Sequence, residues 1–419
     1  MRTNAKRALS CCLLALFALS RGAASEGVLD RVEEALTWSG GGGRQRARLS
    51  GTLDLEFFHS QLPAPALLPI NQTTLVGPRL TTYLDAQWGA HTYLFAQARA
   101  DHGFDSEVGR TQVRFDEYAL RITPWLGRRF SVQFGKFATV VGNWVARHES
   151  WPNPLISAPL PYENLTGIWD NEAIRFVGVL LQWSHVRPGL PASITALEKG
   201  LRVPIIWGPS YALGAAVAGD VGPLRYAFEV KNSALASRPS EWDETSDQLN
   251  HPTVSGRVGY RPNELWTFGL SASTGPYLRT ELRTPLPTGR GFGDYRQVVL
   301  GQDIGFAWHR VQLWSEIFFS RFEIPGVGNA DTLGYYVEAK YKFTPQFFAG
   351  LRWNAQSFGR VTDRGLPVRW GRNTWRIDIA PGFRLSPHAQ LKLQLSLQPD
   401  ELTSRDFTTT VASQVTLRF

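Results

Sequence analysis

Apolar and polar residues alternate along most of the chain, beginning near Ala47 and continuing to the last residue. Residues 391–397 read LKLQLSL and residues 335–343 read YYVEAKYKF, so nearly every second residue is apolar. Since successive side chains of a β-strand point to opposite faces, each such segment predicts a strand with one apolar face. The other face carries charges of both signs, which favours a wet interior over a dry core, where those charges would have to be paired.

The links between these predicted strands fall into two alternating classes. Short links lie near Gly89, residues 124–128, 188–191, 221–223 and 262–264, His309, Pro345 and Pro387, and long links span residues 59–78, 101–109, 142–170, 198–210, 233–251, 275–295, 324–331, 357–372 and 399–406. This asymmetry is typical of an all-β fold, a transmembrane antiparallel β-barrel with short periplasmic turns and long outer loops. The links predict roughly 18 strands, within a range of roughly 16–18, and place both chain ends on the periplasmic side.

Two stretches depart from the regular alternation. Apolar positions are odd-numbered as far as Phe115 and even-numbered from Tyr118, so we expect a β-bulge near Asp116 and Glu117. Four prolines interrupt the pattern between residues 171 and 219, which makes the strand prediction weakest there.

The first residues have the layout of a secretory signal peptide. Arg2, Lys6 and Arg7 precede an apolar run at residues 8–19 and small residues at 22–24, so we expect residues 1–24 to be removed on export. The two cysteines, Cys11 and Cys12, lie within this segment. The mature chain would therefore contain no disulfide, iron–sulfur cluster, covalent haem or cysteine zinc site.

Composition narrows the class further. Four of the 44 basic residues and no acidic residue precede Ser25, so the formal net charge falls from +8 to +4 after cleavage, too mild to indicate nucleic-acid binding. No apolar run after the signal is long enough for a membrane-spanning helix. Aromatic residues make up 12% of the chain, which fits the aromatic girdles of a barrel whose partner is outer-membrane lipid.

We expect the barrel to cover residues 47–419 and residues 25–46 to form a separate segment before it. Val28, Leu29, Val32, Ala35 and Leu36 recur at helical spacing, and Gly40 to Gly43 then interrupt the chain. One interpretation is a short amphipathic helix on a flexible hinge, resting on the periplasmic rim. The other is a plug inside the lumen. We favour the rim because so short a helix needs packing to be stable.

The chain ends in VASQVTLRF, in which Val411, Val415, Leu417 and Phe419 share one face of a strand. A last strand ending in Phe resembles the signal that the barrel-insertion machinery reads in bacterial outer-membrane proteins. The resemblance implies that Val415, Leu417 and Phe419 are an assembly signal, that the insertion machinery is a partner, and that the protein lies in the outer membrane.

The third long link, residues 142–170, is unusually rich in aromatic residues and proline. Residues 135–170 look like a segment of poorly characterised outer-membrane porin-like proteins, and in general porins the third outer loop folds inward and narrows the channel. The resemblance implies a constriction formed by Trp144, Arg147, His148, Glu149, Trp151, Tyr162 and Glu163. The alternative is a loop that covers the mouth of the barrel or contacts neighbouring protomers.

Charged residues on the polar faces of the predicted strands would line the pore. They are Asp54, Glu56, Arg114, Lys340, Lys342, Arg352, Arg376, Asp378, Arg384, Lys392 and Arg418. Basic residues outnumber acidic ones, which favours a weak preference for anions. The alternative is simple solvation of the lumen with internal ion pairs.

Signatures of catalysis are weak. The sequence has no Gly-x-Ser-x-Gly elbow, and its eight histidines lack metal-ligand spacing. We therefore expect no enzymatic activity, no metal and no cofactor. The favoured function is passive diffusion of small hydrophilic solutes through an aqueous barrel, with a homo-oligomer left open. Alternatives are a selective conduit, resembling the alginate-export barrels, and a structural barrel that scaffolds a partner.

Overall fold

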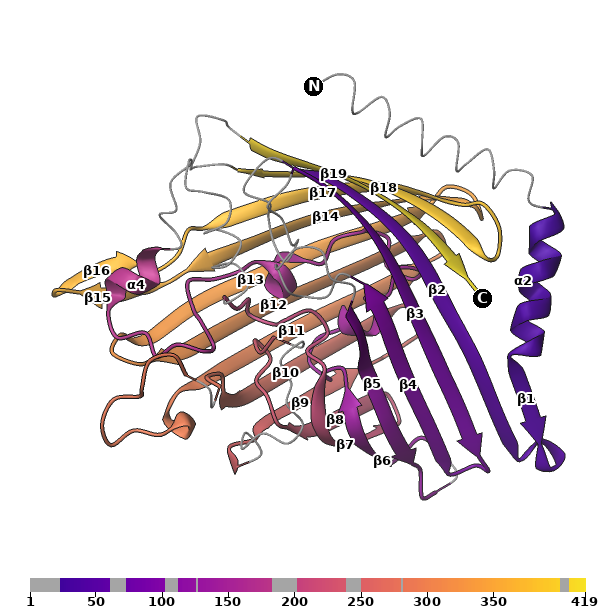
Figure 1. Ribbon diagram of the computed structural model, residues 1–419, viewed down its shortest axis with the longest axis horizontal. Coiled ribbons are helices and arrows are strands. Elements are labelled where there is room, and N and C mark those ends of the chain that lie inside the picture. The colour runs from indigo at the N-terminus through magenta and orange to yellow at the C-terminus, as the bar shows by residue number, and fades with distance from the viewer. Residues whose placement is uncertain are drawn as a thin grey trace.

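The computed structural model describes residues 23–60, 73–101, 112–125, 127–182, 202–238, 250–279, 282–399 and 407–419. Within these ranges sixteen antiparallel strands form a closed barrel, in which β19 completes the ring by pairing with β2 (Figure 1). The barrel strands are β2 (Gln45–Ser60), β3 (Thr74–Trp88), β4 (Thr92–Asp101), β5 (Gln112–Ile122), β6 (Ser131–Phe137), β7 (Ala212–Val221), β8 (Leu224–Lys231), β9 (Thr253–Tyr260), β10 (Trp266–Pro276), β11 (Arg296–Trp308), β12 (Val311–Ile324), β13 (Gly328–Lys342), β14 (Phe347–Phe358), β17 (Thr374–Arg384), β18 (Ala389–Pro399) and β19 (Phe407–Arg418).

The predicted alternation of apolar and polar residues is found in the barrel wall, where apolar side chains point outward and polar ones inward. On β2, Leu55 is 50% exposed on the outer face, whereas Asp54 beside it is 1% exposed inside. On β18, Leu393 and Leu395 are exposed and Lys392 is buried. The all-β antiparallel barrel is thus confirmed. None of the helices in the described ranges is both long and apolar enough to span a bilayer.

The two classes of link lie at opposite ends of the barrel. Short turns join β3 to β4, β7 to β8 and β11 to β12, and the chain also enters β2 and leaves β19 at this end. Phe419 closes the seam there, since its backbone exchanges hydrogen bonds of 2.9 and 3.0 Å with Gly51. In Figure 1 this end is on the right, and the opposite end carries the small β15 (Arg360–Asp363) and β16 (Leu366–Arg369) hairpin.

The strand count falls at the low end of the predicted range. The strand predicted from residue 171 is absent from its described part, residues 171–182, and the strand predicted at residues 192–197 lies outside the described residues. Residues 171–182 form bends and helix α4 (Val177–Gln182), and β7 begins only at Ala212. The predicted turn at residues 188–191 lies outside the described residues. Prolines 204 and 209 remove backbone donors from the segment before β7, which favours irregular structure there.

Other local predictions met mixed outcomes. The β-bulge is confirmed: Gln97 pairs with Glu117 and Ala98 with Phe115, which leaves Asp116 as the extra residue. The predicted long link at residues 324–331 is wrong, because β12 and β13 pair as far as Ile324 and Gly328. Gly326, with a φ of 71°, supplies the left-handed conformation that so tight a turn requires. Large parts of the predicted long links at 59–78, 101–109 and 399–406 lie outside the described residues.

The segment before the barrel folds as helix α2 (Ala23–Ala35) and a short strand, β1 (Thr37–Gly40), which pairs with β2. A 3₁₀ turn at Gly41–Gly43 joins the two strands. Asp30 of α2 lies 2.7 Å from His388, in the short turn between β17 and β18, and Glu33 pairs with Arg48 at 2.5 Å. The helix thus contacts the short-turn rim. Residues 1–22 of the predicted signal lie outside the described residues.

Candidate functional site

The feature that dominates the lumen is the long connection between β6 and β7, residues 138–211, called the insertion below. It contains the 3₁₀ turn Val145–Arg147 and helix α3 (Leu160–Glu163). Figure 1 shows much of it in magenta within the ring of strands, whereas its helix α4 lies at the left, beside β15 and β16. Its described parts, 138–182 and 202–211, are held by side chains that point inward from the barrel wall. Four groups of contacts fix it.

The first anchor is Glu316 on β12. Its carboxylate accepts hydrogen bonds from the backbone N–H groups of Asn143 and Trp144, the latter at 3.1 Å, and from the Tyr162 hydroxyl at 2.8 Å. Gly142 makes this approach possible, since a Cβ there would lie 2.5 Å from a Glu316 oxygen and its φ is 78°. The carboxylate therefore ties both ends of the aromatic part of the insertion to one strand.

The second anchor is Arg147, which leaves the insertion and reaches β13. Its guanidinium donates hydrogen bonds to Glu338 and, at 3.0 Å, to the hydroxyl of Tyr336, and it lies 4.2 Å from the ring of Trp314. Burial alone would lower the pKa of Arg147, but the carboxylate of Glu338 raises it above its ordinary value, so the group stays charged. Arg147 is thus buried in the wall contact.

The third anchor runs along β14 and β17. Arg352 donates to the backbone oxygens of Ser157 and Ala158 at 3.0 and 2.9 Å, and it also pairs with Glu338 and Asp378 at 3.3 and 2.9 Å. Arg376 repeats the arrangement, donating to Ala158 O at 2.6 Å and pairing with Glu163. Two guanidinium groups thereby replace water at backbone carbonyls of the insertion, in charge-assisted hydrogen bonds.

The fourth anchor is on β18. The Nζ of Lys392 donates to the backbone oxygens of Ser150, Asn153 and Leu155 at 2.7, 3.1 and 3.2 Å. The side-chain oxygen of Gln394 accepts the N–H of Ile156 at 2.6 Å. A lysine with three backbone partners holds the insertion in a tight curve against the wall.

The insertion also reaches the other side of the barrel. Glu149 accepts a hydrogen bond from Tyr83 on β3, and His148 lies 3.2 Å from Glu149 and 2.7 Å from the Tyr211 hydroxyl. Burial alone would lower the pKa of His148, but the negative charge of Glu149 raises it; burial alone would raise the pKa of Glu149, but His148 lowers it. The two adjacent residues form an ion pair within the insertion, and the hydrogen bond from Tyr83 to Glu149 connects this pair to β3.

Apolar packing supports these polar anchors. Trp144, Tyr162, Ile205 and Phe318 belong to a buried cluster in which the Trp144 and Tyr162 rings lie 4.6 Å apart. A second cluster joins Ile168 and Leu180 of the insertion to residues of the neighbouring long links, including Trp370 beside β16. The insertion is therefore packed against the barrel wall in the first cluster and against the neighbouring long links in the second.

Toward the short-turn end, the insertion presents Trp151 to the barrel wall. Its ring lies 4.3 Å from the guanidinium carbon of Arg418 and 5.6 Å from that of Arg384. Lys340 and Lys342 follow on the neighbouring inner wall of β13, with the Lys340 ammonium 4.4 Å from the ring of Phe348. Several cations thus gather around this end of the lumen.

The wall formed by β2 to β5 carries a different arrangement. Arg79 pairs with Asp54 and Glu56 at 3.0 and 2.6 Å. Arg99 pairs with Asp116 at 2.9 Å, and Arg114 pairs with Asp101 and Asp116 at 2.6 and 2.8 Å. These ion pairs run from strand to strand and balance one another along the wall.

All the predicted pore-lining residues lie at inward positions, but they differ in access. Asp54, Lys340, Arg352, Arg376, Asp378 and Lys392 are buried, Glu56, Arg114, Lys342 and Arg384 are half-buried, and Arg418 is exposed. Of the predicted constriction residues, Trp144, Arg147, Tyr162 and Glu163 are buried and His148, Glu149 and Trp151 are close to β3 or the short-turn end. Their role in conduction stays a prediction, as does the role of Val415, Leu417 and Phe419 in assembly.

Sequence reasoning missed Glu316, Glu338 and Gln394, which help to hold the insertion, and Arg79 and Arg99, which form ion pairs along the β2–β5 wall. Glu316, Glu338, Gln394, Arg79 and Arg99 occupy the same inward positions as the residues that were chosen, so the alternation could have found them. The described residues contain no group of three metal-ligating side chains.

Comparison with solved structures gives the fold. The chain is similar to an anion-selective porin from Comamonas acidovorans (TM-score 0.53, 11% identity, covering 90% of this chain and 100% of that one). It is also similar to Salmonella typhi OmpF in complex with daunomycin (0.56, 10%, 91% and 100%) and to the outer membrane channel DcaP of Acinetobacter baumannii (0.53, 8%, 91% and 99%). No family model and no curated protein sequence matches the chain. The fold is that of a porin-like barrel.

Proposed function

We propose that this chain is an outer-membrane porin through which small hydrophilic solutes diffuse passively, with the insertion as its constriction. The observation that carries the proposal is the anchoring of the insertion across the lumen, from Glu316 and Arg352 on one wall to Tyr83 on the other. A barrel of roughly 16 strands is wide enough for an aqueous channel, so a segment folded across it narrows the channel without needing to seal it.

A mild preference for anions belongs to the same proposal. The charges of the β2–β5 wall are paired, and Arg352, Arg376 and Asp378 are buried beneath the insertion. The cations at the short-turn end, Lys342 and Arg418 among them, remain accessible. Cationic side chains that line a pore favour anions, and here the accessible charges are mainly cationic.

The remaining parts of the proposal concern export, assembly and partners. An exported chain whose outer face is apolar would be inserted into lipid by the barrel-insertion machinery, with the β19 terminus as its signal, and protomers would associate in the membrane. We propose neither catalysis nor a cofactor.

Deleting Phe419, which closes the seam at Gly51, should lower the amount of heat-modifiable barrel in outer-membrane fractions. Unchanged assembly would count against the role of the terminus.

Single-channel recording in planar bilayers tests the conduction proposal. Replacing residues 145–164 by a short Gly/Ser linker removes Arg147 and Glu163 together, and it leaves Arg352 and Arg376 paired with Glu338 and Asp378 on the wall. Conductance should rise, because the narrowest section dominates the resistance of a water-filled pore.

The matched control shortens the exposed tip of the β15–β16 hairpin, residues 362–367, and should leave conductance unchanged. If the linker variant folds and conducts like the parent, the insertion is not the constriction. If the parent itself passes no ions, the porin proposal fails.

A further inference from the structure

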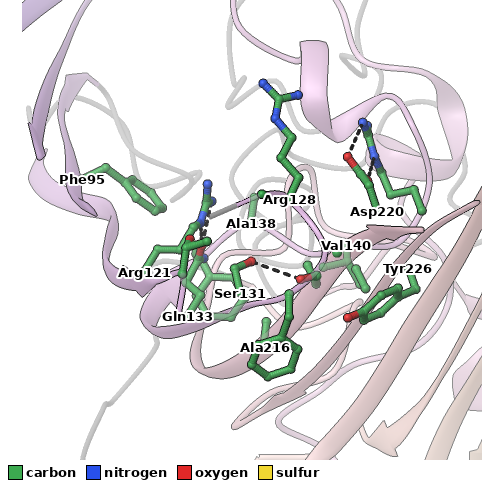
Figure 2. A pocket seen from close by; sticks show the side chains of 18 of the residues that line it. Phe95, Arg121, Arg128, Ser131, Gln133, Ala138, Val140, Ala216, Asp220 and Tyr226 are labelled. Carbon is green, nitrogen blue, oxygen red and sulfur yellow. Dashed lines mark hydrogen bonds and ion pairs between the residues drawn. The ribbon is translucent and has the colours of Figure 1, made fainter. Parts of the chain in front are cut away.

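A pocket of about 680 Å³ lies on the inner wall between the insertion and the short-turn end. Strands β4 to β8 supply its walls, and the first residues of the insertion, Ala138 and Val140, border it (Figure 2). Its volume falls within the range typical of small-molecule sites. The pocket is separate from the anchors described above.

The space exists because the wall carries small side chains at this height. Ala216 and Ala218 of β7 and Ala227 of β8 line the pocket. Aromatic side chains surround this gap: Phe95, Phe130, Phe137 and Tyr226. The result is an apolar wall with aromatic borders, suited to a flat apolar body.

Five charged side chains line the pocket: Glu117, Arg121, Arg128, Asp220 and Arg225. Figure 2 shows Arg121 at the left of the view, Arg128 near its top and Asp220 at the upper right. Asp220 is already paired with Arg225 at 2.8 Å, and the carboxylate of Glu117 accepts the N–H of Ala138 at 2.7 Å. The two acids that line the pocket are thus engaged by their own neighbours.

The two remaining guanidinium groups have neutral surroundings. Arg121 donates two hydrogen bonds to the side-chain oxygen of Gln133, at 3.0 and 2.8 Å, and lies 5.7 Å from the ring of Tyr93. Arg128 is exposed, and within the described residues no ion pair or hydrogen bond of its side chain is found. Both cations therefore face the pocket without a carboxylate to neutralise them.

We propose that this pocket binds small aromatic carboxylates, with the carboxylate at Arg121 and Arg128 and the ring against the alanine and phenylalanine wall. The proposal rests on the porin function and adds a solute class to it: the pocket is a binding station between the insertion and the short-turn mouth. A guanidinium binds a carboxylate through two parallel hydrogen bonds, and the apolar wall excludes ions that have no apolar body.

Binding is measured on the full-length, detergent-folded protein by titration calorimetry with benzoate, inorganic phosphate and benzyl alcohol. Benzoate should bind, whereas phosphate, which lacks the ring, and benzyl alcohol, which lacks the charge, should bind at least about tenfold more weakly, since a charged hydrogen bond contributes roughly this factor or more. Equal binding of phosphate would show a general anion site and overturn the proposal. Equal binding of benzyl alcohol would show an apolar site and also overturn it.

Two variants and one control locate the site. Arg121→Gln and Ala218→Phe should each weaken benzoate binding by about tenfold or more, the first by removing a charge and the second by filling the space. The control, Arg129→Gln, removes the exposed charge next to Arg128, which does not line the pocket, and it should leave binding unchanged. If Arg129→Gln weakens binding as much as Arg121→Gln, or if Arg121→Gln binds benzoate like the parent, the site is not this pocket.

The readouts separate this inference from the proposed function. Binding in detergent does not require conduction, and KCl conductance does not require benzoate. A protein that conducts KCl but does not bind benzoate keeps the porin proposal and overturns the pocket. A protein that binds benzoate but passes no current overturns the porin proposal, and with it the claim that the pocket lies on a conduction path.

Discussion

Two walls of the same barrel use their inward charges in opposite ways. On β12 to β18, Glu316, Arg352 and Lys392 bind the backbone of the insertion and are buried by it. On β2 to β5, Arg79 and Arg114 pair with carboxylates of neighbouring strands. Both walls follow the same alternation of side chains, so the difference comes from what lies against them. An inward charge stays accessible from the lumen only where the insertion leaves it uncovered.

The largest expected effect comes from removing a buried charge on the covered wall. Arg352→Ala leaves Glu338 and Asp378 without this partner and removes a donor from the carbonyls of Ser157 and Ala158, so it should destabilise the barrel by roughly 3–5 kcal/mol. Arg114→Ala, at a half-buried pair on the other wall, should cost about 1 kcal/mol. Denaturant unfolding in lipid, followed by tryptophan fluorescence, measures both. Equal losses would mean that the two walls do not differ as described.

A smaller effect should follow from releasing the insertion while keeping the barrel. Glu316→Ala leaves the N–H groups of Asn143 and Trp144 without their acceptor, at a cost of roughly 1–3 kcal/mol, so the insertion should detach more often. Trypsin should then cleave after Arg147 faster than in the parent. Glu56→Ala on the opposite wall is the control and should leave cleavage at Arg147 slow. Similar cleavage of both variants would contradict the anchoring role of Glu316.

The contact of the insertion with β3 should depend on pH, because Glu149, which accepts the hydrogen bond from Tyr83, is paired with His148. Because the pKa of His148 is raised in the fold, its contribution is fully present below its ordinary pKa of 6.5 and is lost as pH rises through the folded value. Glu149 has a lowered pKa, so its contribution is lost only in stronger acid. Current fluctuations and tryptic cleavage of the insertion should both increase when the pH is raised from below 6.5 to well above it.

His148→Gln tests the assignment, because the amide can still donate to Glu149 but does not titrate. The variant should show the same fluctuations at both pH values. A pH response that persists in His148→Gln must come from another group, and the His148–Glu149 pair would then not be its cause.

The smallest effect concerns selectivity. Arg384→Glu, in the accessible cluster at the short-turn end, should shift the reversal potential in a salt gradient toward cations, whereas Arg79→Glu, at a wall of paired charges, should alter it less. Both shifts should shrink in 1 M salt, where the screening length is about 3 Å. A larger shift for Arg79→Glu would move the selective region to the β2–β5 wall.

Periodic segments were predictable and the irregular segment was not. The facing of each strand, and even the bulge at Asp116, followed from which positions are apolar. Between β6 and β7 prolines interrupt the alternation, and residues 171–182, where a strand was predicted, form bends and α4. The anchors that hold the insertion join residues far apart in the chain, such as Lys392 and Ser150, and no local pattern encodes such pairs.

The order of apolar and polar residues was enough to predict an antiparallel barrel with one apolar face, short turns at one end and a long aromatic third link, because a strand shows its two faces in alternate residues. The closure with sixteen strands, the covering of Arg352 and Lys392, and the open pocket beside Arg121 and Arg128 became visible only in the folded chain. Periodicity fixes which way a side chain points, whereas its burial and charge balance depend on distant segments that pack against it.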